Sequence, residues 1–304
     1  MLFDKLYKDK LTNFGGNEWI PKNTHYIAIM GSVAYGVSSD TSDTDIYSWC
    51  IPPINHVFPH LTGELYGFGD SKNGYARFRN FQEHHISDKN SGKEYDLNVY
   101  NIVDYFQLVM ENNPNMLDSL FVPNRCILHI TNIGQMVREK RKMFLHLGCW
   151  HTFKGYSFAQ LKKAGSQNRT GKRKETVDML GYDPKFLYHC VRLVLECEQI
   201  LTEGDIDLER NTEHLKAIKR GDIGLEEVQK WFTEKELLLD KKYSENKLGL
   251  PWGPKDQNLQ NKAKQLLLNC LEQHYGSLDK LITNPDKEWL ALNEIKQVLT
   301  KYNI

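Results

Sequence analysis

The stretch IAIMGSVAYGVSSDTSDTDIYSWC, residues 27–50, combines two strand-like segments with a pair of nearby aspartates. An apolar, strand-like segment runs up to Gly31, a polar segment follows, and a second strand-like segment contains Asp43 and Asp45. Successive side chains of a strand alternate between its faces, so we expect both aspartates on one face and Ile46 in the core on the other. Neighbouring carboxylates repel unless a cation neutralises them. The pattern therefore predicts a binding site.

Gly31 and Ser32 directly follow the first predicted strand. Without a side chain, Gly31 lets the backbone approach a phosphate closely, and Ser32 offers a hydroxyl and a backbone N–H to it. Gly31 and Gly36 have the spacing of a P-loop, but Val37 occupies the position of the lysine that reaches the phosphates, which excludes a P-loop. Mg²⁺ prefers carboxylate oxygens together with substrate phosphates. The stretch therefore favours a magnesium–nucleotide site.

A third carboxylate is expected on a neighbouring strand, because a two-metal site stabilises both the attacking and the leaving oxygen of a displacement. Glu94 and Asp96 are the candidates, both in the strand-like segment KEYDLNVYN, residues 93–101. We favour Asp96, because an apolar strand continues after it and a helix begins near residue 101. Glu94 lies closer to a predicted turn and stays the alternative.

A narrow polar stripe marks the predicted helix over residues 184–203. Its members recur at helical spacing and are Lys185, His189, Arg192, Glu196 and Gln199. A helix with so narrow a polar face is packed on most sides, so the stripe is expected to face a cleft. There Lys185, His189 and Arg192 would contact a triphosphate, arginine being suited to bidentate phosphate contact. The alternative is a structural stripe of intrahelical pairs such as Arg192–Glu196.

The run KKAGSQNRTGKRK, residues 162–174, holds six basic residues and no acidic residue. Its glycines predict a loop that grips RNA or the nucleotide, the alternative being a solvated loop. The nearby Phe153, Tyr156 and Phe158 fit a helix core better than a base-stacking surface. His84 and His85 have no metal-ligand spacing, and strand alternation places them on opposite faces.

These motifs, taken in order, resemble a known group of enzymes. Gly-Ser, a ten-residue spacer and Asp-x-Asp after a strand are similar to the signature of DNA-polymerase-β-like nucleotidyltransferases. Over about residues 25–230 the chain resembles the RNA repair pathway DNA polymerase beta family, through GSVAYG…SDTDI, YDLNVYNIVDYFQLVMENNPNMLDSLFVP, YSFAQLKK and GYDPKFLYHCVRLV. The resemblance implies nucleotide and metal roles for Gly31, Ser32, Asp43 and Asp45, with Asp96 as the third acid.

The chain changes character near residue 125. The earlier part mixes strand and helix signals, including a hairpin of 80–87 and 93–101 and an irregular insertion over 54–78. The later part has helical periodicity over 131–146, 151–165, 184–203, 212–220, 225–246, 257–274 and 286–302. We therefore expect an α+β fold: a small mixed β-sheet domain of the polymerase-β palm type over residues 1–128, and an all-helical domain over 129–304 that closes the nucleotide cleft.

Composition excludes several classes of protein. Lysine plus arginine equals aspartate plus glutamate, 39 each, which argues against a protein that coats nucleic acid non-specifically. The six cysteines form no Cys-x-x-Cys pair, and no secretory signal or membrane-length apolar run is apparent. The sequence thus predicts a cytoplasmic protein with no membrane partner.

The sequence as a whole predicts a metal-dependent nucleotidyltransferase. Two Mg²⁺ ions, with Mn²⁺ as an alternative, would be held by Asp43, Asp45 and Asp96, and a nucleoside triphosphate such as ATP would lose pyrophosphate to an acceptor hydroxyl. An RNA 3′ end is the first choice of acceptor. A small molecule or a protein hydroxyl is the second, and a non-catalytic nucleotide- or RNA-binding module is a third function.

Overall fold

The computed structural model describes residues 2–38, 44–57, 78–166 and 172–276, together with positions 295, 298 and 299. Four parts of the sequence that carried predictions lie wholly or mostly outside the described residues. They are Asp43, most of the predicted insertion over 54–78, the centre of the basic run, and most of the predicted helix over 286–302.

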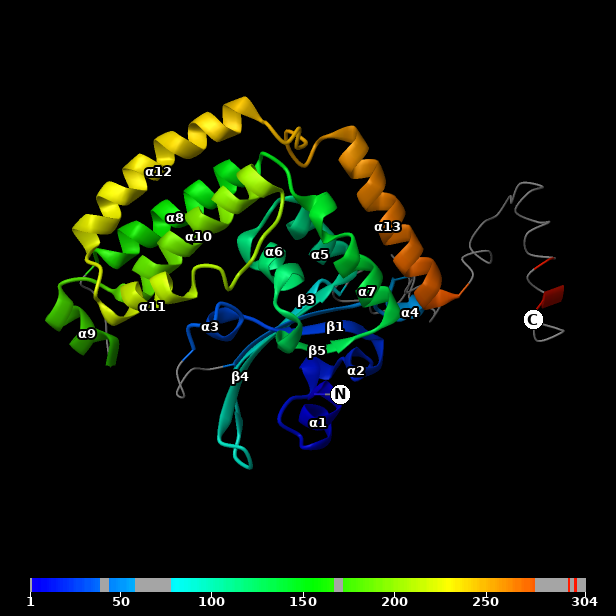
Figure 1. Cartoon of the computed structure of the whole chain (residues 1–304). Coiled ribbons are helices and arrows are strands. Elements are labelled where there is room, and N and C mark those ends of the chain that lie inside the picture. The colour runs from blue at the N-terminus through cyan, green and yellow to red at the C-terminus, as the bar shows by residue number, and fades with distance from the viewer. Residues whose placement is uncertain are drawn as a thin grey trace, which may run out of the picture.

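A five-stranded mixed sheet forms the centre of the described part of the chain (Figure 1). Its order is β3-β4-β2-β1-β5, in which β2 and β4 are parallel and every other neighbouring pair is antiparallel. The parallel pair brings the two acidic segments of the sequence side by side. The strands are β1 (Thr24–Ile29), β2 (Thr44–Cys50), β3 (Asn80–Asp88), β4 (Lys93–Asn101) and β5 (Ile127–Ile130).

The two faces of the sheet bury different clusters. On one face Ile27, Ile46 and Leu97 are fully buried and pack with Phe3 and Leu6 of the N-terminal helix. On the other face the sheet joins a larger core that continues through the helices, with Tyr26 and Trp49 among its members. Ile46 and Asp45 therefore point to opposite faces, as strand alternation predicts.

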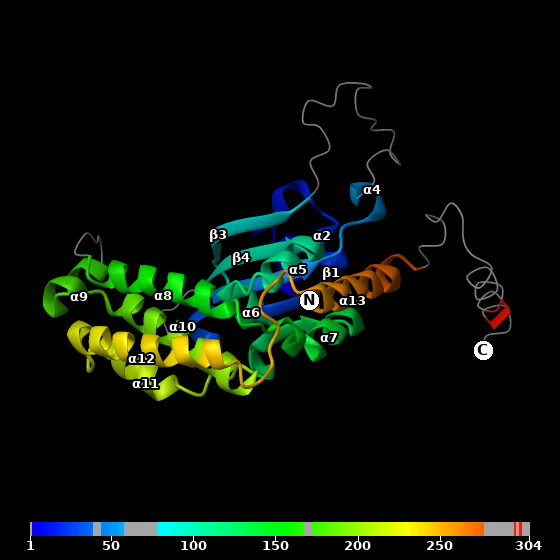
Figure 2. The same cartoon turned by 90° about the horizontal axis from the view of Figure 1, so that it is seen from above.

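The helices divide into two groups around the sheet (Figures 1 and 2). α5, α6, α7 and α13 lie over the sheet, and α13 packs against α5 and α7. α8–α12 form a cluster beside it, in which α10 packs against α8, α11 and α12. The helices are α1 (Leu2–Lys8), α2 (Ile20–Asn23), α3 (Gly31–Ala34), α4 (Ile54–Val57), α5 (Ile102–Met110), α6 (Pro114–Phe121), α7 (Asn132–Glu139), α8 (Cys149–Ala164), α9 (Lys172–Leu180), α10 (Pro184–Glu203), α11 (Thr212–Arg220), α12 (Leu225–Glu245) and α13 (Gln257–Tyr275), with 3-10 turns at Phe14–Gly16, Asn124–Cys126 and Arg141–Phe144.

Local sequence sets the ends of the helices that build the site. Asn113 caps α6, accepting a hydrogen bond from the Met116 N–H. Asp183 caps α10 in the same way through the Lys185 N–H, and proline follows both caps. Gly204, in the left-handed conformation, ends α10. Such caps satisfy backbone groups that a helix end leaves without partners.

The predicted fold class is confirmed, since a small mixed sheet is joined to a helical part. The β3–β4 hairpin and the helices from α5 onward fall close to their expected places. Two elements differ. The short strand β5 pairs with β1 and spans the predicted domain boundary at residue 128, which stays a prediction. The basic run was predicted as a loop, yet its described ends belong to α8 and α9.

Two further observations concern the cysteines and the helices. All six cysteines are buried and form no disulfide. Among the residues that the structure describes, no helix has both the length and the apolar character that a membrane span requires.

Candidate active site

Asp45 and Asp96 are direct neighbours across the parallel strands β2 and β4. Paired residues of adjacent strands point to the same face of a sheet, so the two carboxyl groups share one face. Both residues are half-buried. The register thus places the favoured third acid beside the second member of the Asp-x-Asp pair. Asp43 lies outside the described residues, so its position is not part of this geometry.

The acidic face of β4 also contacts two histidines that the sequence prediction placed on opposite faces. The Asp96 carboxylate accepts a hydrogen bond from the His85 backbone N–H at 2.8 Å, and its Oδ2 lies 3.4 Å from His84 Nδ1. Glu94 Oε1 lies 2.6 Å from His85 Nδ1. Because Glu94 and Asp96 are two residues apart on one strand, both histidine rings reach the same face.

A β-bulge explains why the alternation prediction was wrong for this histidine pair. The register between β3 and β4 shifts between Glu83 and Ile86, and His85 has a positive φ of 58°. An extra residue in one strand breaks the alternation of side chains between faces. The sequence contained one signal that was not used: adjacent histidines opposite an acid-x-acid pair in a predicted hairpin.

Gly31 stands directly against Asp45. Its φ is 65°, and a Cβ built on Gly31 would lie 2.1 Å from Asp45 Oδ2. The Met30 N–H donates to the Asp45 carbonyl oxygen at 2.8 Å, which fixes the backbone of this turn to β2. Glycine is therefore required here, both by the backbone conformation and by the space that the carboxylate occupies.

A cavity of about 340 Å³ opens between the sheet and the helices α6, α8 and α10. It brings together most of the residues predicted for the site, although they are far apart in the sequence. Ser32 follows the lining residue Gly31 in the chain, and Asp96 pairs with the lining residue Asp45 across the sheet. The predicted residues in the lining are Gly31, Asp45, Lys185, His189 and Arg192.

The cavity wall also contains residues that sequence reasoning did not select. Most of them are aromatic or carry side-chain amides, a composition typical of ligand pockets. Helical spacing was the available signal, because Tyr156 and Gln160 are four residues apart on α8 and so share one face. The additional lining residues with aromatic rings or amides are Tyr35, Tyr47, Asn115, Tyr156, Gln160 and Phe186.

Arg192 and Lys185 have different surroundings, although both line the cavity. Arg192 is 5% exposed, and its Nη1 contacts Asp118 and lies 2.9 Å from both Glu196 carboxylate oxygens. Its guanidinium also lies over the Tyr35 ring at 4.3 Å. Burial raises the pKa of both Asp118 and Glu196, and the charge of Arg192 opposes this rise. With both effects together, the pKa of Glu196 is about 8. Lys185 is exposed near the start of α10.

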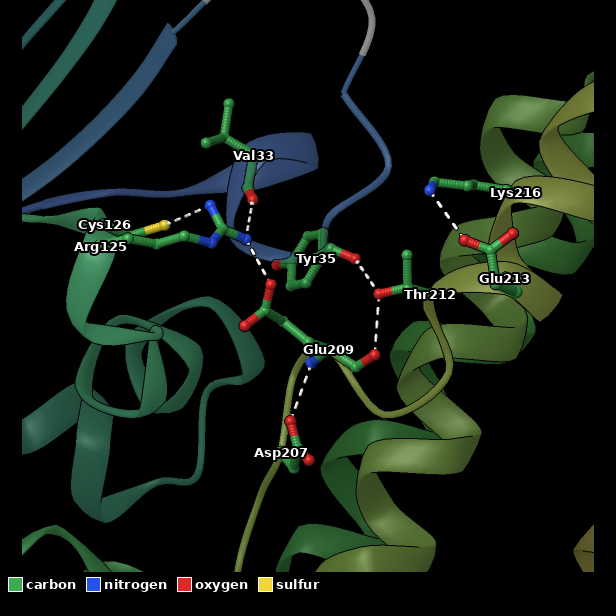
Figure 3. Close-up of polar contacts among 9 residues, drawn as sticks. All are labelled: Val33, Tyr35, Arg125, Cys126, Asp207, Glu209, Thr212, Glu213 and Lys216. Carbon is green, nitrogen blue, oxygen red and sulfur yellow. Dashed lines mark hydrogen bonds and ion pairs between the residues drawn. The ribbon is translucent and has the colours of Figure 1, made fainter.

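Side chains from outside the sheet hold the segment that follows β1, which we call the Gly-Ser segment (residues 31–38). Figure 3 shows Arg125 and Thr212 directed at two of its carbonyl groups. Glu209 pairs with Arg125 at 2.5 Å and extends this network to the loop before α11. The donor-to-carbonyl distances are 3.0 Å from Arg125 Nη2 to Val33, 2.9 Å from Thr212 Oγ1 to Tyr35 and 2.8 Å from Lys219 Nζ to Val37.

The described residues contain two carboxylates of the predicted metal site, Asp45 and Asp96. Within the described ranges, no three His, Cys, Asp or Glu side chains are grouped so as to hold a metal ion. Asp43 lies outside those ranges. The chemistry that remains is a pair of carboxylates, Asp45 and Asp96, at a cavity edge where Gly31 leaves room for the Asp45 carboxylate.

Comparison with known proteins identifies the group to which these features belong. The model of the RNA repair pathway DNA polymerase beta family matches residues 7–251. The chain belongs to this family. The family name indicates a polymerase-β-like nucleotidyltransferase of an RNA repair pathway. The match extends the resemblance seen in the sequence in both directions, and it includes every residue predicted for the site. A search of curated proteins found no match.

Proposed function

We propose that this protein transfers a nucleoside monophosphate from a nucleoside triphosphate to an acceptor hydroxyl, with release of pyrophosphate. The observation that carries the proposal is the in-register pair Asp45–Asp96 at the cavity beside Gly31. The family match supports the reaction type. The triphosphate would bind in the cavity between the sheet and α10, so that its α-phosphorus meets the carboxylate pair.

The carboxylate pair fits a hard divalent cation. Carboxylate oxygens are preferred ligands of Mg²⁺, and Asp45 and Asp96 present theirs on one face. Together with Asp43 they would hold two Mg²⁺ ions, or Mn²⁺ in their place. Such ions supply neutralisation of the charge on the attacking and leaving oxygens. Asp96 would in addition orient the acceptor hydroxyl, and its hydrogen bond from the His85 N–H fixes the carboxylate for that role.

The triphosphate would lie between the Gly-Ser segment and α10. Ser32 would donate to a phosphate oxygen, and exposed Lys185 would neutralise the β- and γ-phosphates, with His189 as a further donor. The sequence prediction gave Arg192 the same task. Because its charge already faces Asp118 and Glu196, we propose that Arg192 mainly positions α10 and Tyr35 at the cavity wall.

The nucleoside would occupy the part of the cavity lined by aromatic rings and amides. Tyr156 and Phe186 offer ring faces, and Asn115 and Gln160 offer donors and acceptors for a base edge. This composition suits a base that is stacked and hydrogen-bonded. A nucleoside triphosphate such as ATP carries a base of this kind.

The acceptor proposed is an RNA 3′ end, which the family name and the basic run support. The test incubates the protein with Mg²⁺, each α-³²P nucleoside triphosphate in turn, and a mixed RNA pool. Label is expected in RNA and is expected to disappear with a chelator. Label in a small molecule or in the protein would instead assign the acceptor to those classes. Nucleotide binding without any transfer would overturn the proposal in favour of a binding module.

A further inference from the structure

Helix α8 and the residues after it form a region without acidic side chains. From Cys149 to Lys174 the chain has no aspartate or glutamate, although it contains 39 of them in 304 residues. The same 26 positions carry seven basic residues. A neutral protein thus concentrates positive charge in one segment, whose Lys162 and Lys163 are exposed on a helix that lines the cavity. A polyanion would find electrostatic complementarity there.

The aromatic residues of α8 do not all belong to the core, contrary to the sequence prediction. Phe153 is buried, but Tyr156 is 46% exposed and Phe158 is 50% exposed. Two rings of this surface have a lysine partner: Lys162 Nζ lies 5.2 Å from the Phe158 ring centroid, and Lys163 Nζ lies 5.7 Å from that of Phe186 on α10. Rings and cations are therefore interleaved on this surface.

These residues form one continuous exposed face, which we call the α8 face. With 100° per residue, Phe158 and Lys162 lie on one side of the helix, one turn apart. Lys163 and Tyr156 lie on the adjoining side, where Tyr156 lines the cavity. Gly155 lies between them, and a Cβ built on it would contact nothing within 4 Å. Figure 2 shows α8 along the edge of the helical cluster. All of these side chains or positions are exposed.

We propose that the α8 face binds single-stranded nucleic acid and leads its 3′ end into the cavity, an inference that rests on the proposed function. Sequence-tolerant binding of single strands combines a positive surface for phosphates with aromatic rings on which bases stack. Phe158 and Tyr156 supply the rings, and Lys162 and Lys163 supply the charge. A duplex hides the faces of its bases, so the α8 face discriminates against it.

The test measures binding in the absence of nucleotide, so that it does not depend on catalysis. A fluorescein-labelled 20-nucleotide RNA is titrated with the full-length protein and with Phe158→Ala/Lys162→Met, and anisotropy is recorded at several salt concentrations. The variant is expected to bind roughly tenfold more weakly. Its slope of log K against log salt is expected to be smaller by about 0.7, the share of one phosphate contact on a single strand.

Matched controls remove an exposed ring and an exposed lysine elsewhere. Trp252 is 61% exposed and the Lys247 side chain is 79% exposed, so Trp252→Ala/Lys247→Met is expected to bind like wild type. A thermal melt checks that both variants are folded. Unlabelled single-stranded DNA and duplex RNA serve as competitors. Competition by single-stranded DNA as well as RNA supports a general single-strand site, and competition by RNA alone supports an RNA site.

The proposal is overturned if the α8 variant binds as wild type, if the control loses as much affinity, or if duplex RNA competes as well as single strands. Its failure is distinguishable from failure of the proposed function. Single-strand binding that depends on Phe158 and Lys162, without any nucleotide transfer, would support binding by the α8 face and contradict the proposed enzymatic activity. Transfer to a small acceptor without single-strand binding would support nucleotidyl transfer and contradict binding by the α8 face.

Discussion

At the scale of single residues, Gly31 is the most constrained position of the candidate site. Replacement by alanine imposes a backbone cost of about 1–2 kcal/mol for φ > 0, and the added Cβ also displaces the Asp45 carboxylate, which lies 2.1 Å away. Since a displacement of about 1 Å can lower a rate by roughly 100-fold, Gly31→Ala is expected to lose nucleotidyl transfer to at least that degree. Initial rates of pyrophosphate release measure this.

Gly249 offers the matched control for this substitution. Its φ is 62°, close to that of Gly31, but a Cβ there meets nothing within 4 Å. Gly249→Ala should therefore lose a similar free energy of unfolding and keep its activity. Equal activity of the two variants would mean that the contact between Gly31 and Asp45 has no part in the reaction.

Lys185 and Arg192 are expected to fail in different ways when each is replaced by methionine. Lys185→Met removes an exposed charge, so we expect a roughly 10–100-fold higher KM for the triphosphate, from the loss of about 1.5–3 kcal/mol of charge-assisted hydrogen bonding, with unchanged stability. Arg192→Met leaves Asp118 and Glu196 buried without their cation, at about 3–5 kcal/mol of unfolding free energy. Urea unfolding and steady-state kinetics separate the two variants. A higher KM with unchanged stability in Arg192→Met would contradict a positioning role for Arg192.

At the scale of elements, α11 and the loop before it support the Gly-Ser segment. Thr212 Oγ1 lies 2.9 Å from the Tyr35 carbonyl oxygen and 2.8 Å from that of Glu209. Thr212→Val removes about 0.5–1.5 kcal/mol of hydrogen bonding. We expect a roughly two- to tenfold higher KM for the triphosphate with kcat little changed, because the segment that receives the phosphates is less well held.

Two further variants test whether this effect belongs to the hydroxyl. Thr212→Ser keeps the hydroxyl and should restore the wild-type KM. Lys216→Met breaks a neighbouring contact on α11, the exposed pair with Glu213 at 2.8 Å (Figure 3), and should change nothing. A KM that rises equally in Thr212→Ser or Lys216→Met would show that α11 acts only through general stability.

Elements with strong local signals were predictable from the sequence. Strand-like runs predicted β1 and β2, a turn between two strand-like segments predicted the hairpin, and the break GYDP at residues 181–184 preceded the helical pattern of α10. β5 was not predicted, because it has only four residues and is a strand only through its pairing with β1. The bulge at His85 escaped because a departure from alternation depends on the partner strand.

The site was predictable as a set of residue types but not as a set of contacts. Spacing alone left Glu94 and Asp96 as alternatives, and only the register of β2 against β4 sets Asp96 opposite Asp45. The stripe on α10 gave two interpretations of Arg192, and the choice depended on Asp118, which lies 74 residues earlier on α6. Such long-range partners are set by packing of the whole chain.

At the scale of the whole molecule, α13 returns from the helical cluster to the sheet. Its residue His274 contacts His25 of β1, with 2.9 Å between His25 Nε2 and His274 Nδ1, and His25 Nδ1 lies 2.9 Å from Thr131 Oγ1. Burial, followed by the charges of His274 and His129, lowers the pKa of His25 to about 4. The folded state thus prefers neutral His25.

This preference predicts how stability depends on pH. Because the pKa of His25 is about 4 in the folded state and about 6.5 in the unfolded state, the unfolded state takes up a proton first as the pH falls. Stability from His25 is complete above pH 6.5 and is lost progressively toward pH 4, by about 3 kcal/mol at most. Urea unfolding of wild type and His25→Gln across this range measures it.

The expected result is a shallower loss of stability with acid in His25→Gln than in wild type. His214→Gln, at an exposed position, is the control and should follow the wild-type curve. Parallel curves for wild type and His25→Gln would exclude a neutral His25 as part of the contact between α13 and the sheet.

We propose that the carboxylate pair of β2 and β4 supports magnesium-dependent nucleotidyl transfer. The most direct measurement is pyrophosphate release by wild type, Asp45→Asn, Asp96→Asn and the surface control Asp222→Asn, with Mg²⁺, the four nucleoside triphosphates and RNA. The account predicts release by wild type and the control, and only background from the two site variants. Release that is equal in all four proteins, or absent from wild type, would contradict it.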